Sequence, residues 1–96
     1  MDPANQTKHD EMLLRMAREY EGQNYRIYAD IEGYPKPATI GGHRPDMLAV
    51  KRRYRIILAI ETLDSLRTPY AAMRDAAFQR ACRRSPLTHY RRVIAR

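Results

Sequence analysis

Apolar and polar residues recur with a helical period over residues 7–21. Because apolar side chains stand at i, i+3, i+4 and i+7, one stripe of this helix is expected to pack on a sheet. The stripe consists of Leu13, Met16, Ala17 and Tyr20. Thr7 is expected to cap the helix and Gly22 to end it, because threonine can bind a free backbone N–H and glycine readily adopts the conformation that stops a helix.

Three shorter segments have the composition of β-strands. Residues 25–31 alternate between apolar and polar side chains, and residues 47–50 and 55–60 are rich in aliphatic ones. Residues 51–54 between the last two are short enough for a hairpin loop, so these strands are expected to be antiparallel neighbours. Residues 32–44 contain several glycines and prolines and are expected to form a long loop, which in a compact domain often has a function.

A second helix is expected from Thr68 to about Arg83, because threonine is a good N-cap and the proline that follows it is favoured at the first helical position. Its buried arc is predicted to contain Tyr70, Ala71, Ala77, Phe78, Ala81 and Cys82. Arg74 falls within this arc. Because a buried arginine needs an anionic partner, we expect Arg74 to point over the sheet toward Glu61 or Asp46.

The order of these segments predicts the fold class. Residues 88–95 follow the helix-breaking Ser85-Pro86 and supply a last strand, so the order is helix, three strands, helix, strand. We expect one α/β (α+β) domain over residues 1–96, with a four-stranded mixed sheet flanked by two helices. No apolar run approaches the about 20 residues that a transmembrane helix needs, so no membrane partner is expected.

Two acidic residues flank the predicted hairpin. With a four-residue hairpin loop, Val50 faces Arg55 and Asp46 faces Ala59, which places Glu61 on the same face, one diagonal step from Asp46. Such a step separates Cβ atoms by roughly 7–8 Å. Two carboxylates at this distance suit a shared Mg²⁺, which takes oxygen ligands and often only one or two from protein. Two solvated acids at strand ends are the alternative.

The segment Pro45-Asp46, followed by a hydrophobic strand that ends in Ala59-Ile60-Glu61-Thr62, resembles the PD-(D/E)XK nuclease superfamily of restriction enzymes and Holliday-junction resolvases. The wider stretch from Ile27 to Leu66 is similar to uncharacterised small prokaryotic members. The resemblance implies a minimal αβββαβ restriction-endonuclease-like core and a Mg²⁺-dependent DNA endonuclease that acts as a homodimer. It also implies that Asp46 and Glu61 are catalytic and bind the metal, with Glu11 of the first helix as a third ligand; a solvated first-turn acid is the alternative for Glu11.

The chain departs from the superfamily pattern on the second hairpin strand. Members carry an acid, any residue and a lysine there. In the register above, the acid position holds Ala59 and the lysine position holds Glu61. A shift by two residues puts Glu61 in the acid position but Leu63 in the lysine position. Neither register supplies the lysine. A catalytically inactive nuclease-fold module that binds DNA or a protein partner is therefore the alternative function.

The charge of the chain indicates a polyanionic partner. A net charge of +7 over 96 residues favours nucleic acid, with DNA as the expected form. From Lys51 onward the many basic residues are opposed only by Glu61, Asp64 and Asp75. Candidate contacts to phosphates or bases are Lys36, His43, Arg44, Lys51, Arg52, Arg53, Arg74, Arg80 and Arg84. A solvated or structural role is the alternative for each, and a small protein–protein module with incidental charge is the alternative for the whole chain.

The remaining composition bears on size and location. Cys82 has no partner for an internal disulfide and is expected to pack as a helix cysteine. The first residues lack the basic and apolar regions of a signal peptide, so a cytoplasmic location is expected. The chain is near the lower size limit for a single unstapled core, which also favours an oligomer.

Overall fold

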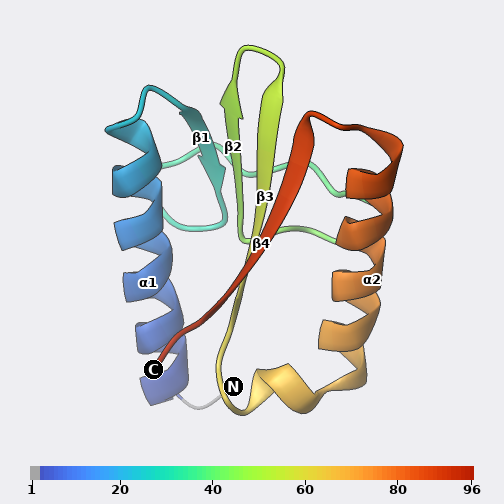
Figure 1. The fold of residues 1–96 in the computed structure, drawn as a ribbon. Coiled ribbons are helices and arrows are strands. Elements are labelled where there is room, and N and C mark those ends of the chain that lie inside the picture. The colour runs from blue at the N-terminus through green and yellow to red at the C-terminus, as the bar shows by residue number, and fades with distance from the viewer. Residues whose placement is uncertain (1–2) are drawn as a thin grey trace.

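A computed structural model describes residues 3–96 and shows three layers, with one helix on each side of a four-stranded sheet (Figure 1). The elements in chain order are helix α1 (Pro3–Glu21), strands β1 (Arg26–Ala29), β2 (Met47–Lys51) and β3 (Tyr54–Glu61), the 3₁₀ helix η1 (Ser65–Arg67), helix α2 (Pro69–Arg84) and strand β4 (Thr88–Ile94). This confirms the predicted α+β class and order of elements. Within residues 3–96, neither helix combines the length and apolar character that crossing a membrane requires.

The strands lie in the order β1-β2-β3-β4, and the sheet is mixed. The first three strands are antiparallel to their neighbours, and β4 is parallel to β3. Val50 pairs with Arg55, as predicted. The hairpin loop is shorter than predicted, because Lys51 pairs with Tyr54 and leaves only two residues in the turn. Arg52 of this turn has a φ of 56°, the positive value that two-residue hairpin turns require.

Each face of the sheet packs against one helix. The predicted stripe of α1 is fully confirmed, because Leu13, Met16, Ala17 and Tyr20 are all buried. They pack with Leu58 and Ile60 of β3, whereas Ile57 and Ala59 of the same strand pack with Ala77 and Phe78 of α2. A strand that is covered on both faces has no side in contact with solvent, so its successive residues are all apolar. This explains why residues 56–60 of β3 form a continuous apolar run in the sequence.

The boundaries of two elements differ from the prediction by more than one residue. Helix α1 begins at Pro3, four residues before the expected cap, and proline is favoured in the first turn of a helix. Thr7 therefore lies within the helix, and its hydroxyl donates to the Pro3 carbonyl in place of capping the helix. Strand β1 ends at Ala29, where the predicted strand continued to residue 31. The chain turns there because the Ala29 N–H binds the Pro35 carbonyl of the following loop.

Helix α2 follows its prediction with one correction. Thr68 is the N-cap, and its hydroxyl accepts a hydrogen bond from the backbone N–H of Ala71 at 3.2 Å. Tyr70, which was predicted to be buried, is 56% exposed. Its ring covers the guanidinium of Arg74 from the solvent side, with 5.8 Å between the ring centre and the guanidinium carbon. Cys82, which was expected to pack as a helix cysteine, is partly buried on α2.

The connection between β1 and β2 leaves the side of α1 and passes against α2 (Figure 1). Gly41 makes the close approach that this path requires: a Cβ atom built there would lie 3.0 Å from the Cβ of Ala77 on α2. Its φ of 60° also lies in the left-handed region that favours glycine. This contact fixes the connection that leads into Asp46, so it helps to position the start of β2.

We expect Gly41→Ala to destabilise the protein more than Gly42→Ala. Both glycines have positive φ, 60° and 83°, so each alanine should cost about 1–2 kcal/mol of backbone strain. Only Gly41 meets a neighbour, because nothing lies within 4 Å of a Cβ built at Gly42. Urea unfolding of both variants measures the difference. Equal losses would show that the loop does not pack against Ala77 as described.

Candidate functional site

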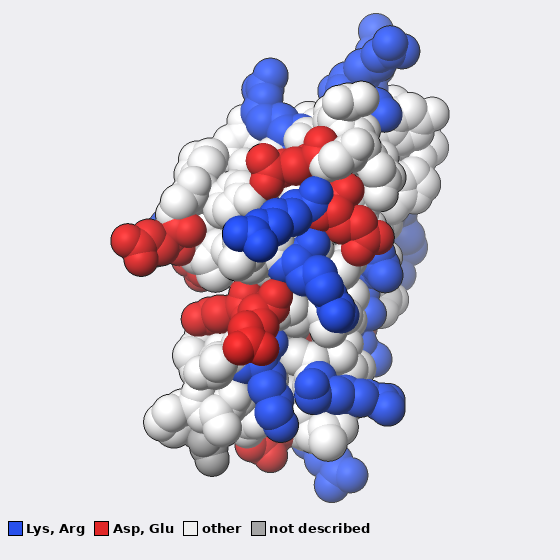
Figure 2. Space-filling view, turned by 90° about the vertical axis from the view of Figure 1, so that its left-hand side faces the viewer, with Lys and Arg blue, Asp and Glu red and all other residues white. Residues whose placement is uncertain are grey.

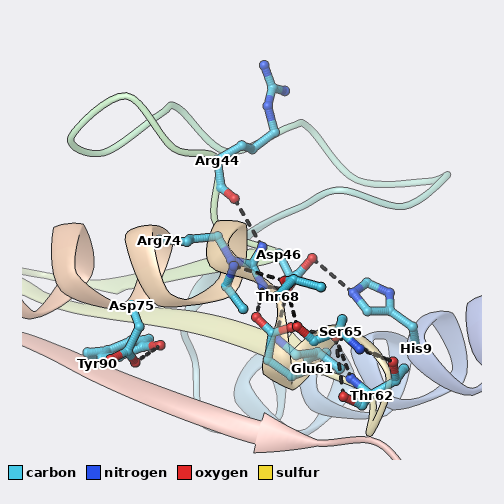
Figure 3. Close-up of polar contacts among 12 residues, drawn as sticks. His9, Arg44, Asp46, Glu61, Thr62, Ser65, Thr68, Arg74, Asp75 and Tyr90 are labelled. Atoms are coloured by element: carbon cyan, nitrogen blue, oxygen red, sulfur yellow. Dashed lines mark hydrogen bonds and ion pairs between the residues drawn. The ribbon is translucent and has the colours of Figure 1, made fainter. Parts of the chain in front are cut away.

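Asp46 and Glu61 lie on the same face of the sheet, as predicted. Asp46 directly precedes β2 and Glu61 ends β3, and both are buried, with 7% and 4% of their surface exposed. Arg74 of α2 lies between them (Figure 3). Its Nη2 is 3.1 Å from Asp46 Oδ2 and 2.8 Å from Glu61 Oε1. This confirms the expected direction of Arg74.

Three further groups complete the hydrogen bonding of the two acids. His9 Nε2 is 3.0 Å from Asp46 Oδ1, and the backbone N–H of Ile60 donates to Asp46 Oδ2 at 2.7 Å. The Ser65 hydroxyl donates to Glu61 Oε2 at 2.5 Å. Each of the four carboxylate oxygens therefore has a partner within the protein. We name this group the acid–arginine cluster; its side chains are His9, Asp46, Glu61, Ser65 and Arg74.

Arg74 links the cluster to its surroundings. It is 7% exposed, and the rings of Tyr70 and Phe78, one turn before and one turn after it on α2, lie 5.8 and 6.0 Å from its guanidinium carbon. Its Nη1 donates to the backbone carbonyl of Arg44 at 3.4 Å. Its Nε is buried and has no hydrogen-bond partner among residues 3–96. One side chain thus connects α2, both hairpin strands and the long loop.

Three members of the cluster, His9, Asp46 and Arg74, have pKa values shifted toward their charged forms. Burial raises the pKa of the Asp46 carboxyl, but the hydrogen bond with His9 and the charge of Arg74 outweigh burial and hold this pKa below its usual value. The hydrogen bond to Asp46 raises the pKa of His9, against the opposing effect of burial. Burial disfavours the Arg74 cation, yet the two acids raise its pKa. Asp46 and Arg74 therefore form a charged pair.

The acid pair does not fit Mg²⁺ in this arrangement. Mg²⁺ requires nearly octahedral coordination by oxygen at about 2.0–2.1 Å. The oxygens of Asp46 and Glu61 instead accept hydrogen bonds, and the guanidinium of Arg74 takes the position between them that a shared cation would need. Within residues 3–96, no group of three or more His, Cys, Asp or Glu side chains is arranged to hold a metal ion.

Glu11, predicted as a third ligand, does not reach the cluster. It is exposed and faces a shallow hollow whose lining includes Lys8 and Arg15. His9 of the same helix reaches Asp46 in its place. Two residues along a helix differ in direction by about 200°, so only one of His9 and Glu11 can face the sheet edge. The α1 stripe indicates this choice, because His9 lies four residues before Leu13 and so falls on the buried side of the helix.

The candidate residues of the long loop do not form one site, because each has different neighbours. Lys36 Nζ is 3.3 Å from Asp30, and both side chains are exposed. The His43 ring packs edge-on against Tyr70, with 5.7 Å between ring centres. The Arg44 side chain is exposed and points away from the acid–arginine cluster (Figure 3). Near the cluster, Arg74 is thus the one predicted phosphate contact that binds the acids directly.

The other predicted contacts lie at the opposite end of the sheet. The β2–β3 hairpin, the end of α2 and the start of β4 lie together at the top of Figure 1, whereas Asp46 and Glu61 stand at the other ends of their strands. The seven steps from Tyr54 to Glu61 span roughly 23 Å at ~3.3 Å per residue. The hairpin arginines are therefore too far from the acid pair to hold a phosphate group there.

Basic side chains gather at this hairpin end. We name the group the hairpin-end basic surface; it consists of Arg26, Lys51, Arg52, Arg53, Arg55, Arg83 and Arg84. Lys51 is partly buried and the arginines are exposed, and Arg80 is exposed one turn earlier on α2. Figure 2 shows the face over α1, where acidic and basic side chains are intermingled and basic side chains project from the top.

Known proteins give no further identification. The chain matches no protein-family model, no curated protein and no solved structure. Its function must therefore be inferred from its own residues and their arrangement.

We expect Arg74→Met to cost about 3–5 kcal/mol of unfolding free energy, because it leaves two buried carboxylates without their cation. The matched control is Arg80→Met on the exposed side of the same helix, which should change stability by less than about 0.5 kcal/mol. Urea unfolding measures both. A loss in Arg74→Met no larger than in the control would show that the cluster does not hold α2 against the sheet.

We expect the stabilisation by His9 to depend on pH. Because its folded-state pKa is raised above 6.5, its contribution is complete below pH 6.5 and is lost as the pH rises through the folded-state value. The stability gap between the wild type and His9→Gln should therefore be widest just below pH 6.5 and narrow in alkaline solution. Urea unfolding at a series of pH values measures this gap. A gap that stays constant with pH would contradict a charged His9–Asp46 pair.

Proposed function

We propose that this protein binds nucleic acid through the hairpin-end basic surface, and that the acid–arginine cluster is structural. The observation that carries the proposal is the segregation of charge. Residues 47–60 and 76–96, which include the hairpin up to Ile60, the second half of α2 and β4, contain no Asp or Glu. All basic residues of this surface except Arg26 lie in these two segments, which supply no acid to neutralise them, and their charge creates a positive field that attracts phosphates.

The shape of the hairpin end supports contact with a phosphate backbone. A shallow hollow of about 550 Å³ lies beside the hairpin, and its lining includes Arg26, Lys51 and Arg52. Positive side chains around an open hollow can follow a flexible polyanion without recognising its sequence. We therefore propose contacts that depend on charge and leave sequence preference weak.

The same proposal explains the acid pair. Buried Asp46 and Glu61 balance the charge of buried Arg74, so they are needed whether or not a phosphodiester is cleaved. Ala59, at the position where the PD-(D/E)XK pattern has an acid, is 1% exposed and packs in the apolar core with Ile57 and Phe78. We thus favour a nuclease-like module that binds DNA over an active endonuclease.

We expect the protein to bind short DNA with an affinity that falls steeply between about 50 and about 200 mM salt. Arg52→Glu combined with Arg53→Glu should weaken binding and reduce the slope of log affinity against log salt by about 2, since each phosphate contact contributes about 1. Fluorescence anisotropy with labelled DNA measures both. The control, Lys8→Glu with Arg15→Glu, makes the same change in net charge on α1 and should leave the slope nearly unchanged.

Two outcomes would contradict the proposal. Equal effects of the hairpin and α1 variants would show that the field of the whole chain, and not this surface, attracts DNA. Cleavage of DNA in the presence of Mg²⁺, abolished by Asp46→Ala, would show that the acid pair is catalytic.

A further inference from the structure

We infer that aromatic side chains at the hairpin end stack on unpaired bases, so that the preferred ligand is single-stranded nucleic acid. The inference rests on the proposed function and specifies its ligand. It concerns the sheet face toward α1, beyond the part that the helix covers. Two exposed rings define the contact there, Tyr54 at the start of β3 and His89 on β4.

The two rings lie together and face the solvent. Their centres are 6.4 Å apart and their planes differ by 20°, so they are stacked nearly parallel. Tyr54 is 50% exposed although it is a large apolar ring in a strand, and His89 is also exposed. His89 pairs with Ile56 across the parallel β3–β4 ladder, which places it on the same face as Tyr54. Two neighbouring strands thus present one aromatic surface.

Basic side chains flank this aromatic pair on the same face. Lys51 is the cross-strand partner of Tyr54, and its Nζ lies over the ring of Tyr25, 5.4 Å from the centre. Arg91 follows two residues after His89, and its Nη1 donates to the Tyr20 hydroxyl at 3.1 Å. One cation thus lies beside Tyr54 on β2, and another lies two residues beyond His89 along β4. From Tyr25, directly before β1, to His89 on β4, these side chains extend over the width of the sheet, roughly 14 Å at ~4.8 Å per strand spacing.

An aromatic surface with cations beside it has the chemistry of a single-strand binding site. Bases of any sequence can stack on exposed rings, while Lys and Arg beside them bind the phosphates. A duplex keeps its bases stacked on one another and offers these rings only its backbone. Tyr54 and His89 should therefore add affinity for a single strand and little for a duplex. The charge of the hairpin-end basic surface serves both ligands equally.

The test compares labelled oligothymidylate, a DNA duplex and a DNA strand of abasic nucleotides by fluorescence anisotropy at one salt concentration. We expect the wild type to bind oligothymidylate more tightly than the other two. Tyr54→Thr, which keeps a residue favoured in strands, should weaken oligothymidylate binding by roughly 5- to 150-fold, the range typical of one lost base stack. Tyr54→Phe should retain the affinity, because it retains the ring. An oligouridylate probe shows whether DNA or RNA binds better.

The control is Tyr70→Thr, which removes another exposed tyrosine, 56% exposed on α2, and should not change single-strand affinity. If the duplex or the abasic strand binds as well as oligothymidylate, or if Tyr54→Thr and Tyr70→Thr behave alike, the stacking inference is wrong while the proposed function stands. If no nucleic acid binds in a salt-dependent manner, both are wrong.

Discussion

The structure depends on the placement of one cation, the guanidinium of Arg74, between two buried carboxylates. A charge removed from water is tolerated only where opposite charge and hydrogen bonds replace the solvent. Arg74 meets this requirement with Asp46 at the start of β2 and Glu61 at the end of β3, and it also holds the long loop through the Arg44 carbonyl. His9 adds α1 to the same group. Both helices are thereby fixed at one end of the sheet.

This internal pairing involves none of the basic side chains at the hairpin end. The acids of the cluster are satisfied by their own partners, and Asp75 on α2 accepts a hydrogen bond from Tyr90 and lies 3.7 Å from Arg92. No acid of the hairpin, of residues 76–84 or of β4 opposes the arginines at the other end. The molecule therefore has a balanced, buried end and an unbalanced, exposed end. Under the proposed function, this division would direct a polyanion to the hairpin and away from the acid pair.

Much of this arrangement follows from local patterns in the sequence. The α1 stripe, the hairpin register and the Thr68 cap were predicted because each depends on neighbours along the chain. The partners of Arg74 were predicted because burial of a charge admits few solutions. His9 was missed in favour of Glu11, because the choice depends on which side of α1 meets the sheet edge. The exposure of Tyr70 was missed because it covers a cation that only the tertiary fold brings beneath it.

The length of β3 prevents the hairpin end and the acid pair from contacting the same short stretch of a ligand. With roughly 23 Å between Tyr54 and Glu61, a strand held at the hairpin would have to continue along the molecule to reach the acids. The long loop is the nearest source of further contacts, but Lys36 is paired with Asp30 and His43 packs against Tyr70. Arg44 alone among the loop candidates extends freely near the cluster. The proposed binding at the hairpin is therefore separable from any chemistry at the acids, and the proposal does not require such chemistry.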